Sequence, residues 1–165
     1  MQTLPEFKTI LYASDLGKHT RPVFRTALSI ARKYGANIIM LHIVEPMSPA
    51  MQAVVDTYLP DGEAEKVYQD GMKAVLTKMK QRLESFCKEE LGSPSIQSGR
   101  VKEILVVSGS TSEEIIRVAE KHLVDLIIIG KSSSSILGSN VAGSTARRVS
   151  RLSSIPVLIV PNYED

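Results

Sequence analysis

Two stretches of the sequence carry residue types that could bind a phosphate-bearing ligand. The first is Asp15, which closes the apolar run 10–13 and whose carboxylate could accept hydrogen bonds from two ribose hydroxyls. The second is the Gly- and Ser-rich segment 130–145, which leads into a predicted helix. Glycine lets the backbone approach a ligand closely, and a helix N-terminus favours an anion. Together the two stretches suit the sugar and the phosphates of a nucleotide.

The distribution of charge supports this interpretation of segment 130–145. Between Lys121 and Ile155 there are five Lys or Arg residues and one acid, Asp125. The whole chain of 165 residues, in contrast, has 20 Lys+Arg, 18 Asp+Glu and a net charge of +2. Positive charge therefore gathers where the phosphates would lie. A Walker A loop is excluded, because Ser144 stands where that loop needs its lysine.

Both stretches also have a purely structural interpretation, which the sequence leaves open. Asp15 could form an Asx turn with Gly17, and segment 130–145 could be a solvated loop in front of a basic helix. No catalytic constellation stands out among the other residues. His42 lies inside an apolar run and is expected in the core, and the single cysteine, Cys87, is expected in the core as well.

The elements that would position these residues alternate between aliphatic runs and amphipathic stretches. Strands are predicted at 10–13, 38–44, within 101–107, at 125–130 and at 156–160. Helices are predicted at 20–34, 63–91 and 142–152. A further helix of about ten residues is predicted to begin at the capping-box pattern of Ser110 and Thr111. Residues 46–62 fit either a proline-rich loop or a short helix over 51–58.

This alternation predicts one α/β domain over residues 1–165. The expected architecture is a doubly wound, five-stranded parallel sheet of order 3-2-1-4-5, with helices on both faces. Ligands of such sheets bind outside the carboxyl ends of the strands, where the strand order reverses. In that order the first and fourth strands are neighbours, so Asp15 and segment 130–145 are expected to meet.

At these residues the chain resembles the universal stress protein family. Its nucleotide motif, Gly-x2-Gly-x9-Gly-Ser/Thr, is matched by Gly130, by Ser133 at the second glycine, and by Gly143 with Ser144. The resemblance covers nearly the whole chain. It implies that Asp15 holds ribose and that Ala13 and Ile43 flank adenine. The phosphates would lie against Gly130, Gly143, Ser144 and Thr145.

The resemblance implies an ATP-binding regulatory protein of the stress response, with Mg²⁺ carried on the phosphates and AMP or ADP as other possible occupants. Ser133 departs from the motif, and we expect it to weaken binding rather than abolish it. The alternatives are a nucleotide-free stress or interaction module and a slow ATP hydrolase. A flavin-binding, flavodoxin-like protein fits less well, because the loop at Asp15 is short and acidic.

Composition and the last strand indicate which partners to expect. The weak net charge argues against nucleic acid, and the apolar runs are too short to insert into a membrane. One cysteine and no visible signal peptide favour a cytoplasmic protein. The apolar strand 156–160 (Pro156, Val157, Leu158, Ile159, Val160) lies at the sheet edge and is expected to pair across a homodimer, with a further protein partner possible.

Overall fold

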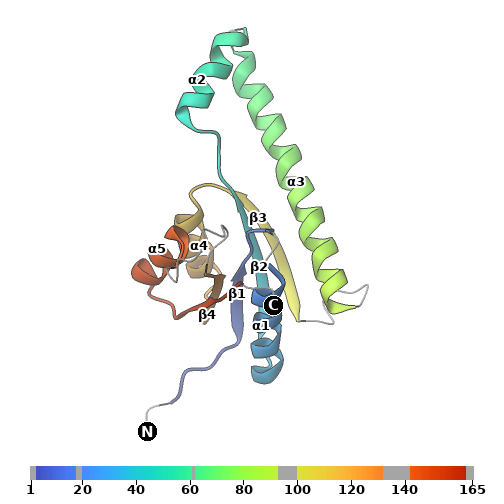
Figure 1. Cartoon of the computed structure of the whole chain (residues 1–165), viewed down its shortest axis with the longest axis vertical. Coiled ribbons are helices and arrows are strands. Elements are labelled where there is room, and N and C mark those ends of the chain that lie inside the picture. Colours follow the sequence, from blue (N-terminus) through green and yellow to red (C-terminus); the bar gives the residue numbers. More distant parts are fainter. Residues whose placement is uncertain (1–2, 18–19, 61, 93–99, 132–141, 163–165) are drawn as a thin grey trace.

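The computed structural model describes residues 3–17, 20–60, 62–92, 100–131 and 142–162. One parallel sheet of five strands forms the centre of the molecule (Figure 1). Its strands are β1 (Thr9–Ala13), β2 (Asn37–Val44), β3 (Val101–Ser108), β4 (Leu126–Gly130) and β5 (Val157–Val160). Their order is β3-β2-β1-β4-β5, so the predicted fold class and strand order are confirmed.

The helices occur where the sequence predicts them, and the structure also shows which of the two predictions for residues 46–62 is correct. They are α1 (Thr20–Tyr34), α2 (Pro49–Tyr58), α3 (Glu63–Leu91), α4 (Thr111–Lys121) and α5 (Ser144–Leu152). Within 46–62 the chain forms the short helix α2, with Ser48 as its N-cap and Pro49 in its first turn. In the described ranges no helix combines the length and the apolar character that a membrane crossing requires.

Alternate residues of the strands build two cores, one on each face of the sheet. Ile10, Tyr12 and Met40 pack with Phe24 of α1 and with the C-terminal part of α3. Leu11, Ile39 and Ile127 pack on the other face with helices α4 and α5. A strand that is covered on both faces must be apolar throughout, which explains the continuous aliphatic runs in the sequence.

Hydrogen bonds at both ends of β1 fix its position between β2 and β4. At the start, the Asp125 carboxylate accepts from the backbone N–H groups of Lys8 and Thr9, both at 2.8 Å. At the end, Ala13 pairs in register with Leu41 and Ile129, and the Ser14 N–H donates to the Leu41 carbonyl at 2.8 Å. The carboxyl ends of β1, β2 and β4 therefore reach the same edge of the sheet.

The expected capping box at the start of α4 is wrong in its hydrogen bonding. The helix begins where the sequence indicates, and Ser110 is its N-cap, but the serine side chain makes no capping bond. Glu113, the acid three residues after Ser110, instead accepts from Arg148 of α5 at 3.0 Å, and Glu114 pairs with Arg117. The Thr111 hydroxyl donates to Oε1 of Glu45 at 2.7 Å, which links the start of α4 to the end of β2.

Helices α2 and the first part of α3 project beyond the sheet (Figure 1). Within the described chain α2 has no buried residue, and α3 buries only Leu83 and Cys87, both near its C-terminal end. Cys87 is confirmed as a core residue, and its Sγ lies 3.2 Å from Sδ of Met40. The long helix therefore packs on the sheet with its C-terminal part alone.

Candidate functional site

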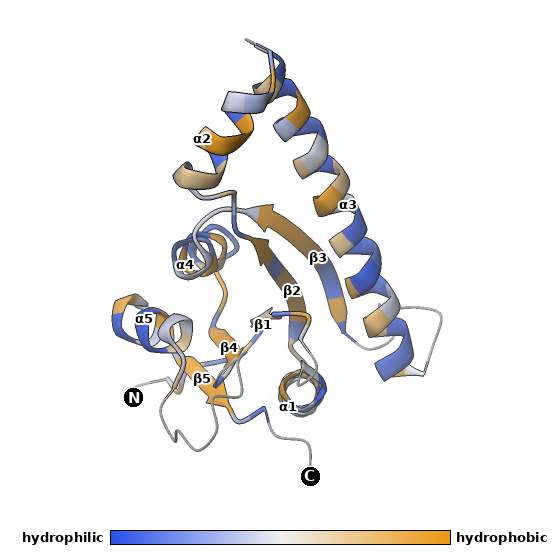
Figure 2. Cartoon of the chain, turned by 45° about the horizontal axis from the view of Figure 1, so that its top comes forward, coloured by the Kyte–Doolittle hydropathy of each residue, from blue (hydrophilic) through white to orange (hydrophobic). Residues whose placement is uncertain are grey.

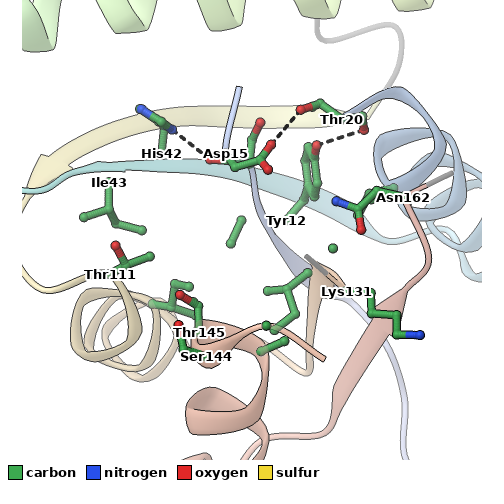
Figure 3. Close-up of a pocket in the computed structure, with 18 of the residues that line it drawn as sticks. Tyr12, Asp15, Thr20, His42, Ile43, Thr111, Lys131, Ser144, Thr145 and Asn162 are labelled. Carbon is green, nitrogen blue, oxygen red and sulfur yellow. Dashed lines mark hydrogen bonds between the residues drawn. The ribbon is translucent and has the colours of Figure 1, made fainter. Parts of the chain in front are cut away.

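A cleft of about 410 Å³ opens at the carboxyl ends of β1, β2 and β4 (Figure 3). It lies where the strand order reverses, between β1 and β4, which is where ligands of this fold class bind. Seven of the eight residues predicted for the site line it: Ala13, Asp15, Ile43, Gly130, Gly143, Ser144 and Thr145. The eighth, Ser133, lies outside the described residues. The fold therefore brings together residues that are more than 100 positions apart in the sequence.

Asp15 points into the cleft and is held by one of its two carboxylate oxygens. Oδ1 accepts from the Gly17 N–H at 2.9 Å and from the Thr20 hydroxyl at 2.8 Å. The Asx-turn interpretation of Asp15 is therefore correct. Among the described residues Oδ2 has no recorded hydrogen bond, so the turn orients the carboxylate and leaves this second oxygen for another donor.

The N-terminus of α5 forms the opposite wall of the cleft. Its cap, Gly143, has an ordinary φ of −59°, and its N–H donates to the Lys131 carbonyl at 2.7 Å. This hydrogen bond joins the start of α5 to the residue after β4, so the Gly143 N–H is not offered to a ligand. The N–H groups of Ser144, Thr145 and Ala146 have no acceptor within the helix, because the first turn of any helix lacks one. These three donors, with the helix dipole, favour an anion.

Gly130 is needed for a close approach, but the approaching group belongs to the protein itself. A Cβ at this position would come within 2.7 Å of Nδ2 of Asn162. Asn162 lies two residues after the end of β5 and lines the cleft as well. The absence of a side chain at Gly130 thus lets the segment after β5 close over the end of β4.

Several cleft residues were missed in the sequence. His42 is half-buried rather than a core residue, and its Nδ1 lies 2.8 Å from the Ser14 carbonyl. The Tyr12 hydroxyl donates to the Thr20 carbonyl at 3.2 Å, and burial raises the pKa of Tyr12 well above its ordinary value. Glu45 and Thr111 close the cleft beside Ile43. Each of these polar residues stands at or near a strand end or a helix start, and that position is the signal that could have found them.

The described residues contain no group of three or more His, Cys, Asp or Glu side chains that could hold a metal ion. Among the polar groups of the cleft, two lie on opposite walls and have different chemistries. One is an acceptor with a spare oxygen, Asp15, and the other is the set of hydroxyl and N–H donors at Ser144 and Thr145. Their arrangement suits a ligand that carries hydroxyls at one end and an anion at the other.

A parallel sheet of order 3-2-1-4-5 with a polar cleft at its reversal point defines a doubly wound α/β protein with a candidate ligand site at the carboxyl ends of its strands. Comparison with known proteins gives the family. The model of the universal stress protein family matches residues 6–161. The chain belongs to the universal stress protein family.

Curated relatives match over nearly their whole length. A universal stress protein of Thermus aquaticus is 27% identical over 154 residues, which cover 93% of this chain and 98% of the relative. Universal stress protein MJ0577 of Methanocaldococcus jannaschii is 27% identical over 158 residues, covering 93% of this chain and 94% of the relative. Both alignments thus cover more than nine-tenths of this chain and of the relative.

Solved structures share the fold. The structure of MJ0577 superposes with a TM-score of 0.68 at 22% identity, and covers 96% of this chain and 99% of that one. A universal stress protein solved in complex with cAMP has a TM-score of 0.54 at 18% identity, with 96% and 99% covered. One from Archaeoglobus fulgidus, solved in complex with dAMP, has a TM-score of 0.51 at 15% identity, with 95% and 99% covered.

Proposed function

We propose that this protein binds an adenine nucleotide, ATP or its di- or monophosphate, and that the bound nucleotide regulates its contacts with a second copy or another protein. The observation that carries the proposal is the cleft in which Asp15 and the N-terminus of α5 form opposite walls. Family members of the same fold were solved with cAMP and with dAMP, which supports an adenine nucleotide as the ligand.

The polar groups of the cleft divide between the two ends of such a ligand. The free oxygen of Asp15 would accept from the ribose hydroxyls, while Ala13 and Ile43 would flank the adenine. The N–H groups and hydroxyls of Ser144 and Thr145 would face the phosphates, with Gly130 at the end of β4 beside them. Ser133, the remaining residue of the motif, is proposed as a further phosphate contact. Mg²⁺ would arrive bound to the phosphate oxygens, which are the hard ligands it prefers.

The route from the cleft to the sheet edge supports a regulatory role. Gly130 lines the cleft and is paired in register with Val160, the last residue of β5. Asn162, two residues later, returns to the cleft and packs against Gly130. A ligand that displaces Asn162 would therefore act on the segment that follows the edge strand β5, where the homodimer contact is expected.

The experiment is a calorimetric titration with Mg·ATP after any co-purified nucleotide has been released by denaturation and identified by mass. We expect low-micromolar to sub-millimolar affinity. Asp15→Asn keeps one oxygen for the Gly17 and Thr20 donors but loses the acceptor for ribose, so affinity should fall at least about tenfold. Gly143→Val, which adds a side chain to the cleft wall, should weaken binding as well.

The matched control is Asp56→Asn, which makes the same chemical change on exposed α2, outside the cleft. It should bind as the wild type does. Equal affinity for wild type, Asp15→Asn and Gly143→Val would contradict the site, and a flat titration with no released nucleotide would support a nucleotide-free module. Phosphate release that scales with protein and vanishes in Ser144→Ala would instead support slow ATP hydrolysis.

A further inference from the structure

We propose that helix α2 and residues 63–82 of α3, which we call the arm, dock against the arm of a second copy of this chain in an antiparallel, twofold-symmetric contact. The proposal rests on the burial, the spacing and the charges of the arm. The argument for it does not use nucleotide binding, because no described residue of the arm lines the cleft. At the end of the arm, Lys78 and Arg82 share a neighbouring pocket with Gly17. The proposed contact also differs from the contact expected at β5, which lies at the other edge of the sheet from β3 and α3.

The arm exposes apolar side chains that a folded chain would ordinarily cover. Among the described residues ten large hydrophobic side chains are exposed, and five of them are in the arm. These are Met51 (54% exposed), Val54 (52%), Tyr58 (82%), Val67 (55%) and Val75 (40%). The other five are spread over the rest of the molecule, so this surface is where apolar exposure concentrates. A concentrated apolar surface of this kind marks an interaction site.

The apolar residues of α3 are spaced for packing against another helix. Tyr68, Met72, Val75 and Met79 follow one another at intervals of four, three and four residues, which places them on one face. Farther along, the same face continues through Leu83 and Phe86 into the core beneath α3. Figure 2 shows hydrophobic segments recurring along α3 well beyond the sheet. Among the described residues this stripe is buried in the core at its C-terminal end, whereas along the arm its side chains are only partly covered or exposed.

The distribution of charge along the arm indicates which partner docks against it and in which orientation. Residues 63–72 carry three acids, Glu63, Glu65 and Asp70, and one base, Lys66. Residues 73–82 carry no acid and four bases: Lys73, Lys78, Lys80 and Arg82. A second arm in antiparallel orientation sets the acidic half of each copy against the basic half of the other. A parallel pair would set like charges together. The arm is thus self-complementary, which is the property that a twofold contact requires.

Two charge-reversed chains test this contact without interference from β5. An acidic-arm chain carries Lys73→Glu, Lys78→Glu and Lys80→Glu, and a basic-arm chain carries Glu63→Lys, Glu65→Lys and Asp70→Lys. Each should repel its own copies and attract the other. There are three pairings: acidic with acidic, basic with basic, and acidic with basic. A contact through β5 would give all three the same affinity. The measurement is the dissociation constant of each pairing, from the fluorescence anisotropy of one labelled chain at low salt.

We expect the acidic–basic pairing to bind at least about tenfold more tightly than either like pairing, and the difference to shrink as salt is added. The matched control reverses three exposed charges outside the arm on each chain, with Arg32→Glu, Lys33→Glu and Lys121→Glu against Glu6→Lys, Glu89→Lys and Glu120→Lys. This control should show no comparable preference. Circular dichroism melts establish that every chain is folded.

Equal dissociation constants for the three arm pairings would overturn the proposal. A preference of the same size in the control chains would overturn it as well, since net charge alone would then account for the result. Failure of nucleotide binding would leave this experiment unaffected, so the two proposals fail separately.

Discussion

Asp15 performs a local structural task and presents a ligand group at the same time. Its Oδ1 orders the turn after β1 by accepting from Gly17 and Thr20, and Oδ2 stays available on the cleft side. The two interpretations that the sequence leaves open are therefore compatible, because a carboxylate has two oxygens and each can accept more than one hydrogen bond. The Asx turn is observed, and the contact with ribose remains a proposal.

Among the individual residues of the cleft, the sequence identifies the glycines, the serines and Asp15 better than it identifies His42 and Asn162. Asp15 and the Gly–Ser segment stand out by composition alone. His42 does not, because an apolar strand conceals which of its residues reach the open end of the sheet. Asn162 reaches the cleft because β5 pairs with β4. This placement depends on the tertiary structure and leaves no local signal in the sequence. Residues that reach a site through strand pairing are the ones that sequence reasoning misses.

Cys87 provides a prediction for the pH dependence of stability. Burial, with a smaller effect of Glu84, raises the pKa of this thiol from 9.0 to about 12. Between these values the unfolded chain ionises its thiol and the folded chain does not, so stability is lost as pH rises through this window. Because Cys87→Ala lacks that loss, the stability difference between wild type and variant should narrow from pH 8 to pH 10.

Urea denaturation at the two pH values measures the change. Cys87→Ala itself removes a buried sulfur and should be less stable at pH 8, so the quantity of interest is the trend and not the starting difference. A stability difference that widens with pH would contradict the burial argument for Cys87.

At the scale of elements, the two parts of α3 should respond differently to truncation. Leu83 is fully buried in the core, so Leu83→Ala should cost about 2–5 kcal/mol in the free energy of unfolding. Val67 is 55% exposed on the arm, so Val67→Ala should change it by no more than about 0.5 kcal/mol.

Chemical denaturation at low-micromolar protein, where contacts between copies are weakest, compares the two variants directly. A cost at Val67 as large as that at Leu83 would mean that the arm packs within its own chain, which would also weaken the case for docking to a second copy.

The elements were predictable to the extent that their patterns are local. The strands were recognisable as continuous aliphatic runs, and the βα alternation indicated a parallel sheet with helices on both faces. The alternation alone does not determine the strand order, because doubly wound sheets of several orders share it. Segment 46–62 stayed open because prolines flank α2 on both sides, although Ser48 and Pro49 make a regular helix start. The capping box at Ser110 failed because Glu113, the acid that would complete it, pairs with Arg148 of α5. Thr111 and Glu114 likewise have other partners, Glu45 and Arg117. The sequence did not reveal that the first half of α3 projects beyond the sheet. The spacing of apolar residues is the same in both halves of this helix.

At the scale of the whole molecule, the open edge at β5 is expected to pair with a second copy. Parallel pairing uses every second residue, and the carbonyls of Pro156 and Val160 accept from β4 and its continuation. The N–H groups of Val157 and Ile159 therefore face outward. Ile159→Pro removes one of these outward donors without removing a bond to β4.

Sedimentation velocity with the acidic-arm chain isolates this contact, because its arms repel each other. We expect the acidic-arm chain to be a dimer at tens of micromolar. Adding Ile159→Pro to this chain should give a monomer. Adding Ile159→Thr, which keeps both the N–H and a branched side chain, should leave the dimer intact. A monomer in all three chains would refute pairing through β5.

The most direct test of the central claim is a crystal structure grown in excess Mg·ATP. The account predicts a nucleotide in the cleft between β1 and α5, with its ribose hydroxyls on Oδ2 of Asp15 and its phosphates at the N–H groups of Ser144 and Thr145. A cleft that remains empty, or that is filled by the protein's own side chains such as Asn162, would contradict it.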